Sequence, residues 1–222
     1  MKKRNDTSRS KKTWYTVLTS LVLLFLISGC SQVPKHLMSV PLDAKDTKPL
    51  AAGQELPNID FKIGETTFKE YLSGKPLVLI FYRGGWCPYC NTHFGQISTV
   101  QDELISMGLR IIAISPDSQE SLMSTKERHM MKYELLSDQD AKIIAAFGLA
   151  YRVTDKRVSI YKQHKMDIEK ASGREHRVLP VPAVYLINSK GTIVYKYANP
   201  NYKVRLQPEQ LIKEAKNLLK SE

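Results

Sequence analysis

Two cysteines, Cys87 and Cys90, are separated by only two residues and lie between an apolar run and an amphipathic segment. The apolar run, residues 76–82, is typical of a strand that is buried on both faces. After the cysteines, apolar residues recur every three or four positions up to Met107, which predicts an amphipathic helix. Residues 109–114 predict a second buried strand. Strand, helix and strand in this order predict a parallel pair with a right-handed crossover.

The rest of the chain extends this pattern into an α/β fold with a mixed central sheet flanked by helices. Additional strands are expected at residues 134–136, 181–187 and 192–197, and additional helices at 118–131, 140–147 and from Pro208 onward. The turn signal between the last two strands makes them antiparallel. Residues 155–177 are charged and weakly patterned, so we interpret them as an inserted loop with some helix.

The first 29 residues have the pattern of a secretory signal, with a basic start, a short apolar core and small residues at the end. The core is shorter than the ~20 residues that a bilayer span needs. The sequence Ile27-Ser28-Gly29-Cys30 resembles the bacterial lipoprotein cleavage box, which implies that Cys30 receives lipid. We therefore expect a signal peptide at 1–29, a tether at 30–50 and a folded domain at 51–222.

A lipid on Cys30 implies a location in the bacterial cell envelope, on the periplasmic face of a membrane. Ser31 follows Cys30 in place of the Asp that commonly retains lipoproteins in the inner membrane, so a Gram-negative host implies the outer membrane. Removing residues 1–29 lowers the net charge from +11 to about +6. The remaining basic excess is dispersed, which is typical of solvation, and we expect no nucleic-acid partner.

The spacing of Cys87 and Cys90 favours redox chemistry over structural stapling. A disulfide between them would close a very short loop and add only about 2 kcal/mol of stability. A helix N-terminus has unpaired amide donors and a partial positive charge, both of which favour a thiolate. In CxxC sites the pKa of a cysteine falls to ~3.5–7.5. The second sulfur also lies within reach of the first, so a mixed disulfide is resolved within the chain.

The segment FYRGGWCPYC, residues 81–90, resembles the CxxC-bearing, peroxiredoxin-like branch of the alkyl hydroperoxide reductase/thiol-specific antioxidant family. The resemblance covers about residues 51–219 and implies a thioredoxin-like fold and an antioxidant role. Trp86 and the CxxC also resemble thioredoxin, and the Pro88-Tyr89 dipeptide resembles glutaredoxin. Further matching segments are Ile114-Ser115-Pro116-Asp117-Ser118, the stretch from Leu135 to Gly148, and residues 181–187.

The sequence departs from true peroxiredoxins at three positions. Those enzymes have Thr three residues and Pro seven residues before the peroxidatic cysteine, where counting back from Cys90 gives Cys87 and Arg83. Their peroxide-binding Arg falls on Pro182. Thioredoxin-like proteins have Pro there, usually after a cis peptide bond, which implies that the Val181 backbone is exposed to pair with an extended substrate.

Two resemblances assign the sulfurs oppositely. The thioredoxin pattern makes Cys87 the exposed, attacking sulfur and Cys90 the buried, resolving one, and we favour this assignment. The peroxiredoxin pattern makes Cys90 peroxidatic. Among the supporting residues, Trp86 is either a packing wall or a substrate contact. Arg83 either stabilises the thiolate or a substrate anion, or is a surface residue at a strand end. His93, one turn after Cys90, could relay protons, but we expect it to be solvated.

We therefore expect a thiol oxidoreductase that performs dithiol–disulfide exchange, with thiol peroxidase activity at Cys90 as the nearest alternative. The substrate is a protein or small-molecule disulfide or a peroxide, and the electron donor is a thioredoxin-like thiol protein or a membrane reductase. No bound cofactor is expected. A copper-binding lipoprotein is the alternative from another class, because thiolates bind Cu(I). A closed zinc site would need four ligands, and the sequence has no second CxxC.

Overall fold

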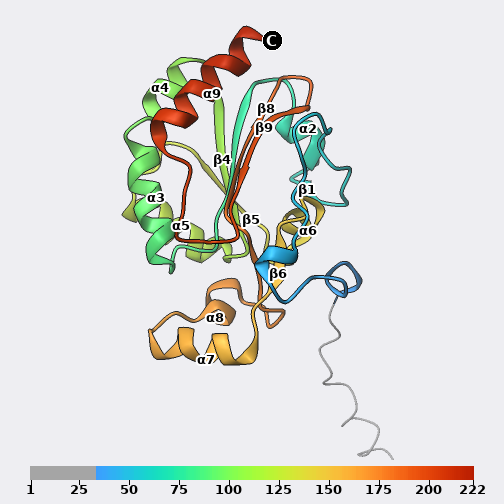
Figure 1. The fold of residues 1–222 in the computed structure, drawn as a ribbon, viewed down its shortest axis with the longest axis vertical. Coiled ribbons are helices and arrows are strands. Elements are labelled where there is room, and N and C mark those ends of the chain that lie inside the picture. The colour runs from blue at the N-terminus through green and yellow to red at the C-terminus, as the bar shows by residue number, and fades with distance from the viewer. Residues whose placement is uncertain (1–33) are drawn as a thin grey trace, which may run out of the picture. The chain divides into compact units, whose positions relative to one another are not determined.

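A five-stranded mixed sheet forms the centre of the fold in the computed structural model, which describes residues 34–222 (Figure 1). The strands are β5 (Glu134–Ser137), β4 (Arg110–Ser115), β3 (Leu77–Phe81), β8 (Ala183–Ile187) and β9 (Ile193–Ala198), in this spatial order. The first three are parallel to one another, and β8 is antiparallel to both β3 and β9. The expected α/β fold with a mixed sheet is confirmed.

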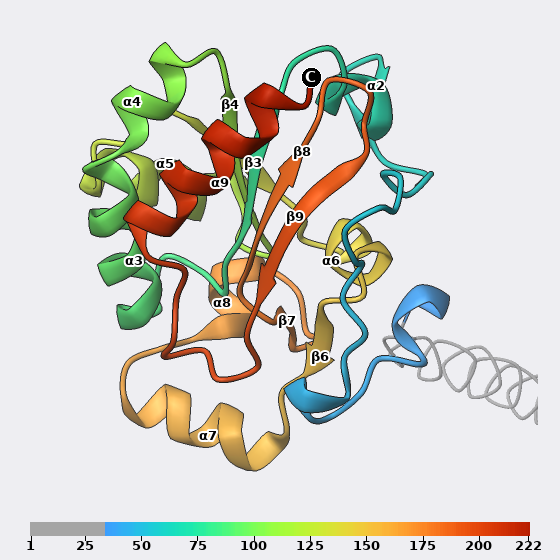
Figure 2. The ribbon, with the colours of Figure 1, turned by 45° about the horizontal axis from the view of Figure 1, so that its top comes forward.

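Helices cover both faces of this sheet (Figure 2). One face carries α3 (Pro88–Ser98), α4 (Gln101–Ser106), α5 (Gln119–Arg128) and α9 (Pro208–Lys220), which bury their apolar residues against it. The other face carries the short helices α2 (Phe68–Leu72) and α6 (Lys142–Ala146). The strands are buried on both faces, and their continuous apolar sequences follow from this.

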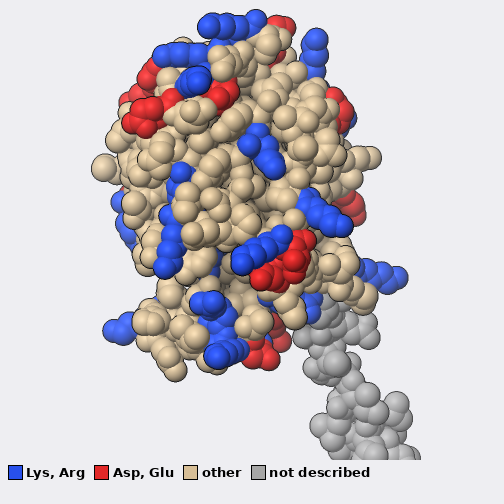
Figure 3. Space-filling model, viewed as in Figure 1, with Lys and Arg blue, Asp and Glu red and all other residues tan. Residues whose placement is uncertain are grey.

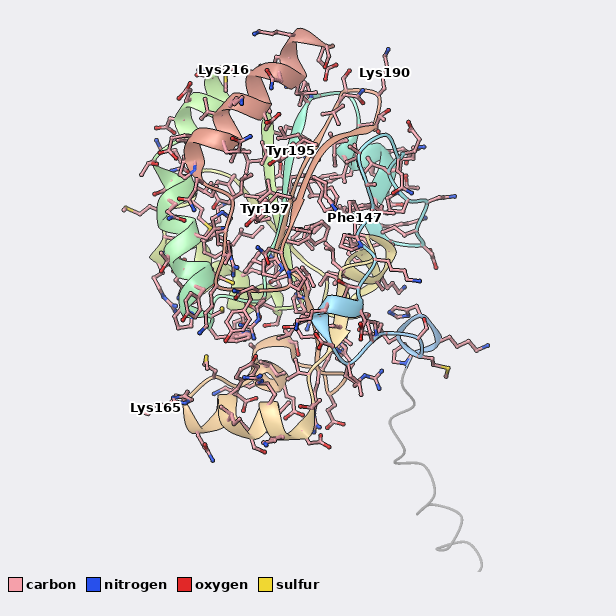
Figure 4. The ribbon with its side chains drawn as sticks, viewed as in Figure 1. Phe147, Lys165, Lys190, Tyr195, Tyr197 and Lys216 are labelled. Carbon is pink, nitrogen blue, oxygen red and sulfur yellow. The ribbon has the colours of Figure 1, made fainter. Side chains whose placement is uncertain are left out.

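Two aromatic groups show how the two faces are filled (Figure 4). Tyr195 and Tyr197 on β9 pack against the cluster under α9. Phe147, at the end of α6, packs its ring against Phe81 of β3 and Tyr185 of β8 with centroids 4.8 Å and 5.2 Å apart. The layer under α9 therefore includes Tyr195 and Tyr197 from β9, and the opposite layer includes aromatic side chains from β3 and β8.

The expected helix after the cysteines is divided into two. Val100 has φ −120° and ψ −3°, which is outside the helical region, so α3 ends and α4 begins on either side of it. The expected strand at 181–187 begins later than predicted, at Ala183. β7 (Val178–Pro180) pairs with β6 (Ala150–Arg152), and β8 begins only after Pro182, which has no N–H to donate to a ladder.

The peptide bond before Pro182 is trans, as are all peptide bonds in the described part of the chain. The cis bond that the resemblance to thioredoxin implied is therefore absent. The antiparallel register nevertheless pairs Phe81 with Ala183, so Pro182 lies beside the end of β3 that leads to the cysteines.

Residues 155–177 contain more regular structure than expected. They form α7 (Asp155–Gln163) and α8 (Ile168–Ser172), which lie beyond one end of the sheet (Figure 1). Thr154 and Asp167 cap the starts of these helices with their side chains. Their buried residues form a small cluster of their own, separate from the main core. The apolar periodicity of residues 155–177 is weak because α7 and α8 each bury only a few residues.

Residues 35–50 contact the folded unit and do not form the expected tether. Leu37 is completely buried, and the Lys48 N–H donates to the Gly148 carbonyl at 3.1 Å. A Cβ on Gly148 would lie 2.0 Å from the Lys48 oxygen, and Gly148 has φ +66°, so this approach requires glycine. The compact unit accordingly begins at Lys35. The hairpin of β1 (Lys62–Ile63) and β2 (Thr66–Thr67) follows this segment.

The predicted signal peptide and the predicted lipid acceptor Cys30 lie outside the described residues. From residue 34 onward, no helix has the length and apolar character that a membrane span requires.

Candidate active site

Both cysteines lie at the start of α3 with free thiols. Cys87 is the N-cap residue, Pro88 occupies the first helical position, and the Cys90 N–H donates to the Cys87 carbonyl at 3.0 Å. Each cysteine is only 1% exposed. The expectation that Cys87 is exposed is therefore wrong for this state, because neighbouring side chains cover the helix start.

Two glycines lead the chain from β3 to the cysteines. Gly84 has φ +151°, a conformation that other residues rarely adopt. A Cβ on Gly85 would lie 1.9 Å from Oγ1 of Thr125 in α5. The close approach to α5 therefore requires glycine, and it fixes how the segment before Cys87 enters the helix.

The pKa values of the two cysteines are shifted in opposite directions. A hydrogen bond from the Cys90 side chain, supported by the charge of Arg83, lowers the pKa of Cys87 against the opposing effect of burial. Burial and the neighbouring Cys87 raise the pKa of Cys90 well above its usual range. The pair therefore holds one thiolate at Cys87 and one thiol at Cys90 that donates to it.

Arg83 is the cation that contacts Cys87. Its Nη1 lies 3.4 Å from the Cys87 sulfur, and the residue is 2% exposed, so it is not a surface arginine. The guanidinium carbon also lies 5.1, 5.2 and 4.1 Å from the ring centroids of Trp86, Tyr161 and Tyr202. Tyr161 accepts a hydrogen bond from Arg83 Nη2. Aromatic contacts stabilise a guanidinium that has left water.

Arg205 is a second buried arginine at the site, and sequence reasoning missed it. Its Nη2 lies 3.7 Å from the Cys90 sulfur, and the residue is 8% exposed. It lies in the loop before α9, far from the CxxC in sequence. The one available signal is its position between the apolar residues Val204 and Leu206.

His93 is buried and not solvated as expected. It is 4% exposed, and its Nε2 has no hydrogen-bond partner among the described residues. Burial and the nearby charge of Arg205 lower its pKa to about 4. The imidazole is therefore neutral at physiological pH, which argues against a charged role beside Cys90.

Asp117 is a buried acid that connects the site to α5. Its Oδ2 accepts from the Gly85 N–H at 2.7 Å. Burial raises the pKa of Asp117 to about 7, although the Gly85 amide and the Trp86 side chain act in the opposite direction. It belongs to the Ser-Pro-Asp-Ser segment, but nothing in the sequence indicated that it supports the cysteine loop.

The remaining predicted residues divide between the site and the sheet. Trp86 is half-buried and packs against Tyr161 with centroids 5.9 Å apart, which makes it a wall of the site. The Val181 N–H donates to the Leu149 carbonyl at 2.8 Å, so it is not free to pair with an extended substrate as predicted. The Pro182 carbonyl accepts from the Asn199 N–H.

A cavity of about 400 Å³ adjoins the loop before Cys87. Gly85, Trp86 and Asp117 line one side, and residues of α5 and of the α7–α8 segment line the rest. Lys165, at the turn between α7 and α8, is one of them (Figure 4).

Charged residues are spread over the visible face without a single-sign patch (Figure 3). Lys, Arg, Asp and Glu are interspersed on it, which agrees with a dispersed basic excess. Among residues 34–222, no three or more His, Cys, Asp or Glu side chains gather in a group that could hold a metal ion.

Comparison with known proteins identifies similar sequences. A family model described as "AhpC/TSA family" matches residues 50–196. The chain is 34% identical over 99 residues to peroxiredoxin Bcp of Bacillus subtilis (strain 168), which covers 44% of this chain and 63% of that protein. It is 28% identical over 103 residues to peroxiredoxin Bcp of Escherichia coli (strain K12), and this alignment covers 46% of this chain and 66% of that protein. The chain thus spans just under two thirds of the length of these curated relatives.

Solved structures show the same fold. The crystal structure of reduced Prx3 in complex with H2O2 from Vibrio vulnificus matches with a TM-score of 0.60 and 17% identity, and covers 75% of this chain and 96% of that one. This likeness confirms the expected thioredoxin-like fold.

Proposed function

The chain belongs to the AhpC/TSA family, and on this premise we propose that it is a thiol-dependent peroxidase in which Cys87 attacks and Cys90 resolves. The observation that carries the proposal is the contact between Arg83 Nη1 and the Cys87 sulfur at 3.4 Å. A guanidinium at this distance stabilises a thiolate, and the thiolate is the nucleophile in reactions with peroxide. The relatives named peroxiredoxin support peroxide as the oxidant.

The proposed reaction has three steps. The Cys87 thiolate attacks the peroxide, the O–O bond breaks, and Cys87 becomes a sulfenic acid while the leaving alkoxide or hydroxide takes up a proton. The Cys90 sulfur then attacks the sulfenic sulfur and forms a Cys87–Cys90 disulfide with release of water. A thiol electron donor, either a thioredoxin-like protein or a membrane reductase, reduces this disulfide by thiol–disulfide exchange.

Burial of Cys87 favours a small oxidant for the first step. The residue is 1% exposed, with Trp86 and Tyr161 packed against each other beside it. A peroxide group brings two oxygen atoms to the sulfur, whereas a protein disulfide requires its own backbone to reach the same place. The peroxide-binding Arg expected from true peroxiredoxins is replaced at its position by Pro182, and Arg83 supplies a guanidinium from the opposite strand instead.

The test is stopped-flow oxidation by hydrogen peroxide of two variants, each of which keeps one cysteine of the CxxC pair. Cys90→Ser should react much faster than a free thiolate and accumulate sulfenic acid at Cys87, which dimedone labels. Cys87→Ser should react slowly, because the pKa of Cys90 is raised. Fast reaction and sulfenic acid at Cys90 in the Cys87→Ser protein would instead assign the peroxidatic role to Cys90.

Dithiol–disulfide exchange with another protein is the second candidate, and the CxxC at a helix start favours it. It uses the same thiolate, so the two activities differ only in the oxidant. Incubation of Cys90→Ser with envelope extract should then trap a mixed disulfide at Cys87. If peroxide oxidises Cys87 rapidly and no mixed disulfide forms, exchange is not the activity.

We also propose that Cys30 carries lipid and anchors the protein to a membrane of the bacterial cell envelope. The support is the Ile27-Ser28-Gly29-Cys30 sequence after a basic and apolar start. Acyl chains contribute ~0.8 kcal/mol per buried methylene to membrane binding. Cys30→Ser should leave an unprocessed precursor without lipid, and incorporation of a labelled fatty acid into this variant would contradict the proposal.

A further inference from the structure

We propose that Arg205 is the residue that activates Cys90 for the second step, by stabilising its thiolate once Cys87 has been oxidised. The inference rests on the proposed peroxidase function for its place in the reaction. Its physical basis is independent of that function, because it concerns the ionisation of one buried thiol beside one buried guanidinium.

One arginine side chain lies beside each cysteine sulfur. Arg83 Nη1 lies 3.4 Å from the Cys87 sulfur and Arg205 Nη2 lies 3.7 Å from the Cys90 sulfur. The two arginines come from different parts of the chain, the end of β3 and the loop before α9. Both are buried, at 2% and 8% exposure.

Neither arginine has a carboxylate partner in the described part of the chain. The ion pairs within residues 34–222 involve other basic residues throughout. An uncompensated buried charge costs several kcal/mol. Arg83 also has its aromatic contacts, but the anion that lies beside each guanidinium can only come from a cysteine sulfur in its thiolate form. The Arg205 side chain otherwise donates to the Val204 carbonyl, which is neutral.

Apart from Cys87 and the two arginines, the titratable side chains beside Cys90 carry no charge at neutral pH. Burial raises the pKa of Tyr82 well above its usual range, so this phenol stays protonated. Burial lowers the pKa of His93 to about 4, so this imidazole stays neutral. Arg83 contributes its backbone to Cys90 and directs its side chain to Cys87. Arg205 is thus the cation whose side chain faces the Cys90 sulfur.

Oxidation of Cys87 changes the balance of charge at the site. Before oxidation, two guanidiniums face one thiolate, and the Cys90 thiol donates to that thiolate. After oxidation the sulfenic acid is neutral, so both guanidiniums lack an anion and the Cys90 thiol has lost its charged acceptor. Loss of the Cys90 proton to solvent restores the original charge. The Cys90 thiolate then attacks the sulfenic sulfur, the S–O bond breaks, and the leaving hydroxide takes up a proton to form water.

The first test needs no peroxide. In the Cys87→Ser protein the neighbouring anion is absent, as it is after oxidation, and Cys90 is the thiol whose absorbance at 240 nm is titrated. Adding Arg205→Gln should reduce the thiolate fraction of Cys90 at least tenfold at a given pH, which is one pKa unit. Arg205→Lys should recover part of this loss, and Arg205→Met, which keeps the buried stem, serves if the Gln variant does not fold. Lys203→Gln removes an exposed charge from the same loop and should change the fraction less than twofold.

The second test separates the two steps in the protein with both cysteines. Arg205→Gln should slow disulfide formation at least tenfold, slow the oxidation of Cys87 by hydrogen peroxide much less, and increase dimedone labelling of Cys87. Its disulfide-forming rate should recover at higher pH. An unchanged Cys90 titration, or equal slowing of both steps, overturns the proposal. If no variant reacts faster than a free thiolate but the titration shifts as expected, the peroxidase function fails and the role of Arg205 in ionising Cys90 stands.

Discussion

Tyr161 in α7 packs its ring against Trp86 with centroids 5.9 Å apart, and its hydroxyl group accepts a hydrogen bond from Arg83. Through these two contacts the α7–α8 segment covers the residues around Cys87. The position of this segment over Cys87 explains why Cys87, at the start of α3, is only 1% exposed.

Removal of the Tyr161 ring should uncover Cys87. In a Cys90→Ser background, Tyr161→Ala should raise the rate of Cys87 alkylation by a bulky maleimide several-fold, because the ring is 6% exposed and leaves a void when deleted. Tyr161→Phe keeps the ring, so the maleimide should alkylate Cys87 in this variant at nearly the original rate. Equal rates for the Ala and Phe variants would show that the ring does not limit access.

Loss of the Arg83 charge should move the pH profile of Cys87 to higher pH. The hydrogen bond from Cys90 and the Arg83 charge lower the pKa of Cys87, so Arg83→Gln should raise that pKa. The thiolate fraction at pH 6 should fall on the order of tenfold, and the difference should disappear at a pH where both proteins are fully ionised. Thiolate absorbance at 240 nm in the Cys90→Ser background measures this. Lys156→Gln, an exposed charge in α7, is the matched control and should not shift the profile.

Two glycine substitutions should have opposite effects on stability. Gly85→Ala places a methyl group 1.9 Å from Thr125 Oγ1, so it should displace α5 or the cysteine loop and cost more than 1 kcal/mol. Gly95→Ala is exposed within α3 with nothing within 4 Å of the new methyl group. It should stabilise the protein by about 0.5–1 kcal/mol, because alanine favours a helix. Urea unfolding of both variants checks the prediction, which is wrong if the two shifts have the same sign.

His93 should make the protein less stable as the pH falls. Its pKa is about 4 when folded and about 6.5 when unfolded, so below pH 6.5 the unfolded state binds the extra proton. The loss should reach about 2 kcal/mol at pH 5 and level off below pH 4. His93→Leu should remove this part of the difference between pH 7.5 and pH 5 in urea unfolding.

Two buried acids act in the opposite direction in the same pH range. The pKa values of Asp117 and Asp138 are raised to about 7 by burial, so their contribution is present at low pH and is lost as the pH rises through 7. Both acids are unchanged in His93→Leu, so their effect cancels in the comparison. A pH dependence that is unchanged in His93→Leu would rule out His93 as its source.

Most of the fold could be predicted because the sheet and its main helices have strong sequence patterns. The strands β3 and β8 are buried on both faces and are continuous apolar runs, and α9 has a regular apolar face. Residues 35–50 have no periodicity, because they attach to the fold through individual side chains such as Leu37 and through backbone hydrogen bonds. Backbone pairing leaves no side-chain signature.

The cysteine pair could be predicted from its spacing, but its charged neighbours could not. Arg83 is adjacent in sequence and was a candidate. Arg205 and Tyr161 reach the site from distant segments, and each is a single polar or aromatic residue without a motif. Their positions follow from how α7 and the loop before α9 pack, and sequence periodicity does not determine that packing.

The α7–α8 segment is held on its outer side by ion pairs. Arg177 pairs with both Asp155 and Glu169, and Lys162 pairs with Glu169 at 2.6 Å. These groups are partly exposed, so dissolved salt weakens the attraction between their charges. The apolar contacts beneath the segment do not weaken in the same way. Higher ionic strength therefore weakens these ion pairs more than the apolar contacts that hold the segment over Cys87.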